Sequence, residues 1–426
     1  MATDAPDSAP ALTNGSPYKP RYIDIGINLA DPIFRGQYHG TQRHPDDLSA
    51  VVSRAQEVGC QKLIITGSDF TSSRHALEIA KEYPGTVYAT AGIHPCTSSI
   101  FSTSHSHVDA NGHTMPCNPD PSLPISEDHE PDVEKTASII AELRSLVEQA
   151  RSSSGTGPSP LVAFGEFGLD YDRLHYCSKK IQLHSFAAQL DLVLSLKPQL
   201  PLFLHSRAAH ADFVSMLKAK FGPRLEKLEH GAVVHSFTGT ADEMRELMDL
   251  GLYIGTNGCS FKTAENCDVV REIHLDRLML ETDGPWCEVR PSHEGWKYLV
   301  EAAKSTALDT ANPTPVLNLV LNTEASSSTE PINSQPADQQ LQRPRKGKQQ
   351  QQQSKKPPKK KESEVPERYK TVKKEKWVEG AMVKGRNEPC MIERVGQIVA
   401  GIKGVTVEEV CEAAWRNTTK VFAVDE

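Results

Sequence analysis

The sequence lacks the segments that take a protein into or across a membrane. No apolar run approaches the roughly 18 residues of a membrane-spanning helix, and residues 1–20 have neither the basic start nor the apolar core of a signal peptide. The nine cysteines form no Cys-x-x-Cys pair, and their odd number leaves at least one unpaired. These absences exclude a secreted disulfide framework and a membrane-spanning chain, and they predict a cytoplasmic or nuclear protein with reduced thiols.

The hydrophobic content of the sequence is slightly low, and positive charge is concentrated in one segment. Hydrophobic types make up 38% of the 426 residues, and the deficit falls in a few polar stretches. The net charge is −8, but residues 343–376 hold 14 Lys or Arg against 4 Glu, so the other residues carry −18. This basic segment either attracts nucleic acid, acts as a nuclear-localisation signal, or is a solvated low-complexity insertion with no such role.

Eight short apolar runs recur along the chain, and most are separated by stretches with helical spacing that often end at Gly. The runs lie at residues 22–28, 62–67, 87–94, 161–166, 201–206, 232–237, 252–257 and 277–282. Alternating strands and helices predict a parallel sheet buried on both faces. Eight such units predict a (β/α)8 TIM barrel, and an open doubly wound sheet is the structural alternative.

Composition also predicts the domain boundaries. We expect a disordered N-terminus at 1–20 and a barrel hydrolase domain at 21–304, with a polar loop insertion at 97–134. Residues 305–376 are polar, then rich in Gln and Lys, and predict a disordered basic insertion. Apolar residues at helical spacing in 377–426 predict helices that complete the barrel.

Five ionisable residues stand at the ends of predicted strands, where side chains of a TIM barrel face the active site. They are His94, Glu166, His205, His235 and Asp283. Taken singly, a His in such a place is more often structural, and an Asp before Gly-Pro is often a turn former. Together, imidazoles and carboxylates form a ligand set suited to one or two Mg²⁺, Mn²⁺ or Zn²⁺ ions.

Several ordered motifs carry a family resemblance. GEFGLDYDR (165–173), FLHSRAAH (203–210), VVHSFTGT (233–240), ETDGPWCEVRPSH (281–293) and KGRNEPC (384–390) occur together with DIGINL and AGIHP. Over residues 22–300 and 384–423 the chain resembles the TatD family of metal-dependent deoxyribonucleases. The resemblance implies a (β/α)8 barrel and magnesium-dependent hydrolysis of DNA phosphodiesters, with 3′ to 5′ exonuclease activity.

The resemblance also assigns residue roles. It places the metal ligands at Glu166, His205, His235 and Asp283, and a substrate-phosphate contact at His94. Many relatives begin with a His-x-His pair, where this chain has Gly26 and Asn28 as the TatD proper subgroup does. Met391 stands where relatives often have His, and we assign it no catalytic role.

The ligand set leads to a hydrolytic mechanism. Asp283 is the expected general base, and it forms the catalytic group together with Glu166 and His94. Arg207 and Arg386 are expected to bind phosphate oxygens of the substrate, with structural salt bridges as an equal alternative for both.

Single-stranded DNA is the predicted substrate, because a strand end enters a barrel mouth more easily than continuous duplex does. Trp286, Phe261 or Tyr171 could stack on bases, although local packing is the commoner role for such aromatics. One rival hypothesis is an amidohydrolase or lactonase on the same barrel, and another is a non-catalytic nucleic-acid-binding protein. DNA repair and DNA degradation are both compatible roles.

Overall fold

The computed structural model describes residues 18–103, 130–152, 159–311 and 365–424. Contacts divide the chain into two units, one of residues 1–302 with 367–426 and one of residues 303–366. The first unit holds every element of the barrel. Of the second, the structure describes the end of helix α8, which runs from Trp296 to Ala311, and residues 365 and 366.

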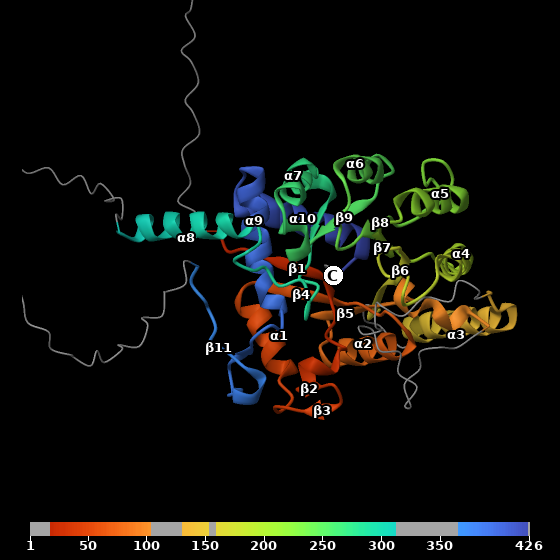
Figure 1. Ribbon diagram of the computed structural model, residues 1–426, viewed down its shortest axis with the longest axis horizontal. Coiled ribbons are helices and arrows are strands. Elements are labelled where there is room, and N and C mark those ends of the chain that lie inside the picture. Colours follow the sequence, from red (N-terminus) through yellow and green to blue (C-terminus); the bar gives the residue numbers. More distant parts are fainter. Residues whose placement is uncertain (1–17, 104–129, 153–158, 312–364, 425–426) are drawn as a thin grey trace, which may run out of the picture. The chain divides into compact units, whose positions relative to one another are not determined.

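The first unit is built around a sheet of eight parallel strands that follow one another in chain order (Figure 1). The strands are β1 (Tyr22–Ile27), β4 (Cys60–Ile65), β5 (Val87–Ala91), β6 (Leu161–Asp170), β7 (Leu202–Arg207), β8 (Ala232–Val234), β9 (Tyr253–Thr256) and β10 (Leu278–Leu280). The chain just after β10 donates from Asp283 N to Gly26 O at 2.8 Å, and Asn28 N donates to Gly284 O at 2.8 Å. These bonds join the last strand to the first, so the predicted TIM barrel is confirmed over the open sheet.

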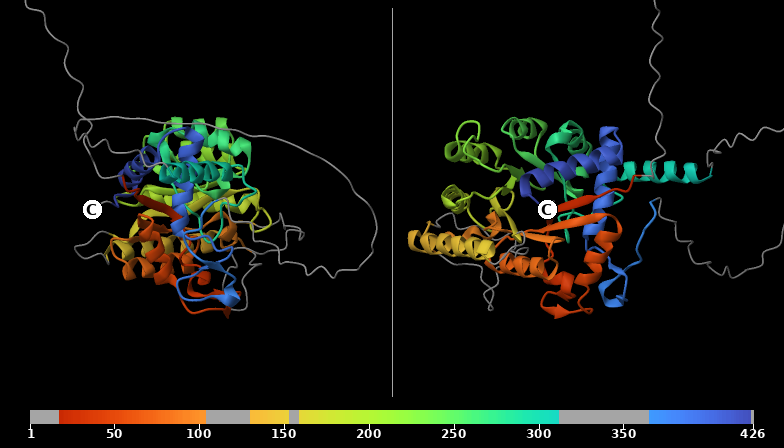
Figure 2. Two further views of the ribbon diagram at one scale, coloured as in Figure 1. Left: turned by 90° about the vertical axis from the view of Figure 1, so that its left-hand side faces the viewer. Right: turned by 180° about the vertical axis from the view of Figure 1, so that it is seen from behind.

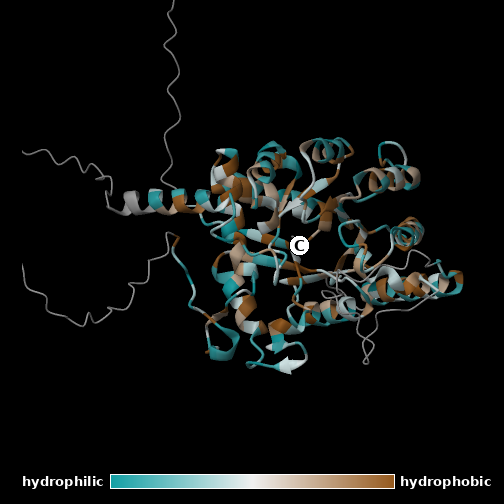
Figure 3. Cartoon of the chain, viewed as in Figure 1, coloured by the Kyte–Doolittle hydropathy of each residue, from teal (hydrophilic) through white to brown (hydrophobic). Residues whose placement is uncertain are grey.

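Helices cover the outside of the sheet, and their amphipathic sequences explain this placement. Figure 3 shows both hydrophobic and hydrophilic residues along them. They are α1 (Leu48–Glu57), α2 (Phe70–Glu82), α3 (Val133–Ser152), α4 (Lys179–Ser195), α5 (His210–Phe221), α6 (Ala241–Asp249) and α7 (Ala264–Glu272), followed after α8 by α9 (Ile392–Lys403) and α10 (Val407–Phe422). Reciprocal capping boxes start α2 at Asp69, α6 at Thr240 and α10 at Thr406, which satisfies amide groups that a helix start leaves free.

Helix α10 covers the end of the barrel where the strands begin, opposite to the C-terminal strand ends where the predicted site residues lie. Its Trp415 and Phe422 belong to one buried cluster with Ile23, Val162 and Val233 from the beginnings of strands. Figure 2 shows α9 and α10 beside β1. Burying each large apolar side chain contributes about 1.5–3 kcal/mol, so this cluster seals one end and leaves the other open for a site.

Short elements occupy the loops. They are the two-residue strands β2 (Gln37–Tyr38), β3 (Thr41–Gln42), β11 (Thr371–Val372) and β12 (Met382–Val383), and the 3-10 helices η1 (Pro32–Arg35), η2 (Pro95–Phe101), η3 (Gly258–Phe261), η4 (Leu275–Arg277), η5 (Lys374–Lys376) and η6 (Pro389–Met391). No helix within the described ranges is long and apolar enough to cross a membrane.

The predicted disordered segments lie mostly outside the described residues, and their edges differ from the prediction. Residues 97–101 belong to the 3-10 helix η2, Phe101 is completely buried, and α3 already begins at Val133. Within 305–376, α8 extends through Ala311, and β11 pairs with β12. The disorder of residues 1–17 and 312–364 and the polar loop insertion over 104–129 lie outside the described residues and remain predictions.

Candidate metal centre and active site

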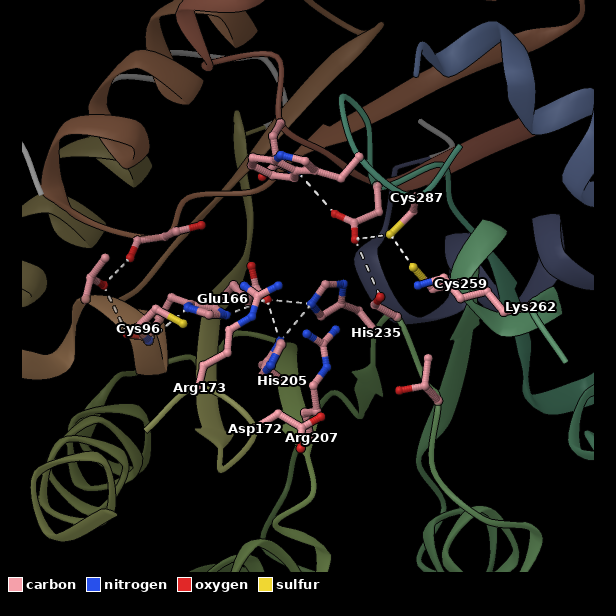
Figure 4. Close-up of a pocket in the computed structure, with 18 of the residues that line it drawn as sticks. Cys96, Glu166, Asp172, Arg173, His205, Arg207, His235, Cys259, Lys262 and Cys287 are labelled. Atoms are coloured by element: carbon pink, nitrogen blue, oxygen red, sulfur yellow. Dashed lines mark hydrogen bonds and ion pairs between the residues drawn. The ribbon is translucent and has the colours of Figure 1, made fainter. Parts of the chain in front are cut away.

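A cavity of about 620 Å³ opens where the strands of the barrel end. Its walls include six of the seven residues predicted from the sequence as metal ligands, catalytic groups or phosphate contacts: His94, Glu166, His205, Arg207, His235 and Asp283. Asn28, one of the two strand-one substitutions, also lines it. Glu166 lies within β6, His205 and Arg207 lie in the C-terminal half of β7, and the others follow β1, β5, β8 and β10. Figure 4 shows Glu166, His205 and His235 directed toward the same space. The cavity thus brings together residues that are far apart in the sequence, such as Asn28 and Asp283, which are 255 positions apart.

Glu166 is the centre of this cavity. Its Oε1 lies 2.5 Å from His235 Nε2, 2.9 Å from His205 Nδ1 and 3.3 Å from His94 Nε2. Potential ligand atoms of His94, Glu166 and His205 all lie within 4.8 Å of one another. Convergence of imidazole nitrogens on one carboxylate oxygen gives the mixed donor set that divalent cations bind.

The hydrogen-bond partners of each imidazole indicate which ring nitrogen a cation would use. His205 Nε2 lies 3.1 Å from Asp170 Oδ2 and Nδ1 lies 2.9 Å from Glu166 Oε1, so each ring nitrogen faces a carboxylate oxygen. With a cation bound at Glu166, a proton kept on Nε2 by Asp170 would leave the lone pair of Nδ1 for the cation. In contrast, His94 Nδ1 accepts from Cys96 N at 3.0 Å, which leaves the proton on Nε2. His205 is therefore arranged as a ligand for a cation, whereas His94 is arranged as a hydrogen-bond donor.

Buried charges of both signs shift one another's protonation. Burial alone would raise the pKa of Glu166, but the imidazoles of His235 and His94 lower it well below its usual range. Burial alone would lower the pKa of His235, but Glu166 and Glu281 raise it well above its usual range. Without a metal ion the cluster therefore holds a carboxylate with protonated imidazole, and a divalent ion and protons compete for the same atoms.

Asp283 forms the opposite wall of the cavity. Its Oδ1 accepts from Asn28 Nδ2 at 3.2 Å, and its Oδ2 accepts from Cys287 Sγ at 3.2 Å and from Ser236 Oγ at 3.5 Å. Burial raises the pKa of Asp283 to about 6, although nearby His235 opposes the shift. A carboxylate that titrates this close to neutrality can take up and release a proton under physiological conditions.

Comparisons with known proteins identify the family. The profile described as TatD related DNase matches residues 23–312. The chain belongs to this family. It is 36% identical to the protein named Deoxyribonuclease Tat-D from Schizosaccharomyces pombe over 403 residues, which cover 95% of this chain and 96% of that one. It is also 33% identical to the 3′-5′ ssDNA/RNA exonuclease TatD from Erwinia tasmaniensis, over 62% of this chain and 80% of that one.

A solved structure supports the same family assignment. An uncharacterized amidohydrolase from Saccharomyces cerevisiae superimposes with a TM-score of 0.66 at 28% identity, over 95% of this chain and 100% of that one. The resemblance inferred from the motifs is thus confirmed. Membership in the TatD-related DNase family makes this chain a hydrolase that acts on DNA, and the family's metal dependence agrees with the cluster around Glu166.

Gly26, one of the two strand-one substitutions named from the sequence, stands where there is little room for a side chain. A Cβ atom at Gly26 would lie 2.6 Å from Glu281 Oε2 and 3.3 Å from Phe203. Glu281 fills this space and accepts from Ser236 N at 2.5 Å and from Asn257 Nδ2 at 3.2 Å. A side chain at position 26 is therefore excluded by a carboxylate that also lies 3.5 Å from His235 Nδ1.

Sequence reasoning missed Glu281 and Asp170 as parts of the TatD site. Asp170 is completely buried and contacts His205, as described above. A signal for it existed, because alternate residues of a strand face the same side and β6 runs through both Glu166 and Asp170. Glu281 stands two residues before Asp283 in the ETDGP motif, inside the apolar run at 277–282 that predicts the last strand.

Arg386 lies apart from the residues that line the cavity. Its guanidinium donates to Asp47 Oδ2 at 2.6 Å and to Glu388 Oε1 at 2.9 Å, and its side chain is fully buried away from the cavity. Arg54 Nε also donates to Glu388, at 2.8 Å, which makes this a buried ionic network. The structural salt bridge, left open by the sequence, is the role that the contacts support.

Two of the three aromatic residues suggested for base stacking are also placed elsewhere. Phe261 is completely buried, and the Tyr171 hydroxyl donates to Asp212 at 2.7 Å outside the residues that line the cavity. Trp286 does line the cavity, and 41% of its surface is exposed. Only Trp286 therefore has the position that stacking requires.

Two thiols also meet at the wall formed by Asp283. Cys259 Sγ lies 2.8 Å from Cys287 Sγ, and either thiol can be the donor of this hydrogen bond. Both cysteines line the cavity beside Lys262 (Figure 4). The eight cysteines of the described residues are free thiols.

Proposed function

We propose that this cavity hydrolyses phosphodiester bonds at the 3′ end of single-stranded DNA. The observation that carries the proposal is the position of Glu166 Oε1, surrounded by three imidazoles at 2.5–3.3 Å at the bottom of an open cavity. In this proposal Glu166, His205, His235 and Asp283 hold a divalent ion, Mg²⁺ before Mn²⁺ or Zn²⁺. When bound, the ion supplies charge stabilisation for phosphoryl oxygens and lowers the pKa of water.

The side chains around the ion have separate roles in the proposed reaction. Asp283, whose pKa burial raises to about 6, accepts the proton of the attacking water. The Nε2 proton of His94 is available for a phosphate oxygen, because Nδ1 is engaged with Cys96 N. Arg207 lines the same wall and is the second donor to phosphate.

Charge and shape favour a nucleic-acid strand end over a lactone or amide. The cavity is lined by Arg173, Arg207 and Lys262 in addition to the imidazoles, which suits a polyanion. Glu166 is only 6% exposed, so the scissile phosphate must enter the cavity to reach it, and a free strand end does so most easily. Exposed Trp286 at the wall offers a face for the terminal base.

Cleavage of end-labelled oligonucleotides tests this proposal. Full-length protein is incubated with single-stranded DNA labelled at the 5′ end, with Mg²⁺, with Mn²⁺ or with EDTA, beside His205→Ala and Asp283→Asn. We expect a ladder of shortened 5′-labelled products with metal that is lost with EDTA and in both variants. Immediate release of labelled mononucleotide would instead show the opposite polarity.

Parallel substrates decide between the alternatives. Single-stranded RNA, duplex DNA and a simple lactone are tested under the same conditions as single-stranded DNA. Faster hydrolysis of the lactone than of any nucleic acid would support the amidohydrolase hypothesis. Binding without hydrolysis under every metal would support a nucleic-acid-binding protein and contradict the proposal.

A further inference from the structure

Cys259 and Cys287 are held together by the backbone of two loops. Cys259 belongs to η3, and Cys287 follows β10 by a few residues in the loop that carries Asp283. A Cβ atom at Gly258 would lie 1.8 Å from the carbonyl oxygen of Cys287, so the two main chains touch. The 2.8 Å between the sulfur atoms therefore results from packing of the loops and not from one chance side-chain orientation.

The loop of Cys259 is also fixed from its other side. Asn257 Oδ1 accepts from Cys259 N at 2.8 Å, and Asn257 Nδ2 donates to Ser236 Oγ at 2.9 Å. Ser260 Oγ donates to Phe237 O at 3.0 Å. These bonds attach η3 to the chain after β8, which leaves the two thiols little freedom to move apart.

Both thiols are reachable from the cavity, and one of them contacts the proposed metal centre. Cys259 and Cys287 are among the lining residues, so a small oxidant that enters the cavity meets them. Cys287 Sγ donates to Asp283 Oδ2 at 3.2 Å. Any reaction that removes the proton from Cys287 therefore removes one of the hydrogen bonds that Asp283 accepts.

We propose that Cys259 and Cys287 are a site of reversible oxidation that controls the hydrolase through Asp283. The oxidant is a small peroxide. One thiol sulfur attacks a peroxide oxygen, the O–O bond breaks, water leaves, and the sulfur becomes a sulfenic acid. The second thiol then displaces the hydroxyl as another water, so two thiols and hydrogen peroxide give one disulfide and two waters.

The consequence for activity follows from the contacts and rests on the proposed function. In the disulfide, Cys287 has no proton to donate, and Asp283 keeps only Asn28 and Ser236 as side-chain donors. Hydrogen bonds to charged groups contribute enough that we expect activity to fall about ten-fold on oxidation. A dithiol reductant restores both thiols and the activity, as expected for a redox-sensing pair among reduced cysteines.

Peptide mapping of the full chain tests the site itself. Protein is treated with hydrogen peroxide, remaining thiols are alkylated, and the protein is digested with trypsin, whose cleavage after Lys262 and Arg277 puts the two cysteines on different peptides. We expect a linked pair of peptides that carry Cys259 and Cys287, absent after reduction with dithiothreitol. Oxidation elsewhere without this link would overturn the proposal.

Activity and metal binding are followed on the same samples. The activity of wild type, Cys259→Ser and Cys96→Ser is measured before and after treatment with peroxide. Cys96→Ser is the matched control, because Cys96 lines the same cavity. The Cys259→Ser protein should lose the response to peroxide, and Cys96→Ser should keep it. Two results would reject control through this pair. One is a disulfide that forms while the activity and the Mn²⁺ affinity stay the same, and the other is a Cys259→Ser protein that responds to peroxide as strongly as wild type.

The two proposals fail in different ways. If the reduced wild type hydrolyses no nucleic acid, the proposed function fails, but the linked peptides and the Mn²⁺ affinity measured by calorimetry still test the cysteine pair. If the reduced protein is active and peroxide leaves its rate unchanged, the cysteine proposal fails and the proposed function stands.

Discussion

His205 Nε2 lies 3.1 Å from Asp170 Oδ2, and this contact turns the other nitrogen of His205 toward Glu166 at 2.9 Å. Burial alone would raise the pKa of Asp170, but His205 and Arg207 lower it, so the carboxylate is ionised and accepts the proton of Nε2. Carboxylates that orient a ligating histidine in this way raise its basicity and fix its tautomer.

Asp170→Asn is therefore expected to weaken metal binding without removing a ligand. The loss should be about 10- to 100-fold in affinity, the range typical of such supporting carboxylates. Titration of Mn²⁺ into metal-free protein by calorimetry measures it. Asp172→Asn is the control, because Asp172 lines the cavity but is exposed. An affinity for Asp170→Asn equal to that of wild type would show that Asp170 does not orient His205.

Arg207→Gln should raise KM for DNA more than it lowers kcat. Arg207 lines the cavity with 22% of its side chain exposed, and its Nη1 is 3.8 Å from Asp170 Oδ2. Loss of one charge-assisted contact to phosphate should raise KM about ten-fold. It should also reduce the slope of log KM against log salt concentration by about 1. Steady-state kinetics at several salt concentrations measure both. Exposed Arg224 lies outside the cavity lining, so Arg224→Gln should match wild type.

Trp286→Ala should weaken binding of oligonucleotides and leave a small phosphodiester unaffected. Stacking on one base contributes about 1–3 kcal/mol, which corresponds to roughly 5- to 150-fold in KM. Trp286→Phe keeps an aromatic face and should recover most of the affinity. Comparable losses with bis-p-nitrophenyl phosphate and with an oligonucleotide would show that Trp286 shapes the cavity instead of binding a base.

Arg386→Met tests the corrected role of the buried arginine. The change leaves Asp47 and Glu388 as buried carboxylates with Arg54 alone to compensate them, so we expect a loss of about 3–5 kcal/mol in unfolding free energy. Urea unfolding measures the loss. The KM of the folded variant should not change. Arg245→Met removes an exposed ion pair with Glu272 and should change stability little. A raised KM together with a wild-type free energy of unfolding would show that Arg386 binds substrate.

The buried carboxyl group of Asp24 should make the stability of the protein depend on pH. Burial raises its pKa from 3.8 to about 8, although donors from Thr282 and from Gly26 N oppose the shift. The stabilisation is complete below pH 3.8, where both states hold the proton, and it is lost as pH rises toward about 8, because the unfolded state alone has released it. Unfolding midpoints measured between those limits should therefore fall with pH in wild type.

Asp24→Asn should remove this part of the slope, because an amide does not titrate. Asp242→Asn changes a carboxylate whose side chain is 94% exposed and should leave the slope as in wild type. Parallel slopes for wild type and Asp24→Asn would mean that Asp24 is ionised in the folded protein and that its three hydrogen-bond donors outweigh burial.

The sequence alone was sufficient for the barrel. Adjacent strand residues such as Leu63 and Ile64 face opposite sides of the parallel sheet, and both are completely buried. Each strand therefore appears in the sequence as an apolar run that local composition reveals. The strand-end rule then selected Glu166, His205, His235 and Asp283, because strand termini of a barrel converge wherever the loops lead. Their roles as ligands stay predictions.

The tertiary structure alone decided what these residues contact. Whether Arg386 reaches a substrate phosphate or Asp47 depends on α1, more than 300 positions away, and no local pattern reports such a distance. The same holds for Glu281 in the space beside Gly26 and for Cys259 against Cys287. Periodicity encodes which face of an element is buried, whereas these pairings arise only when different elements pack against one another.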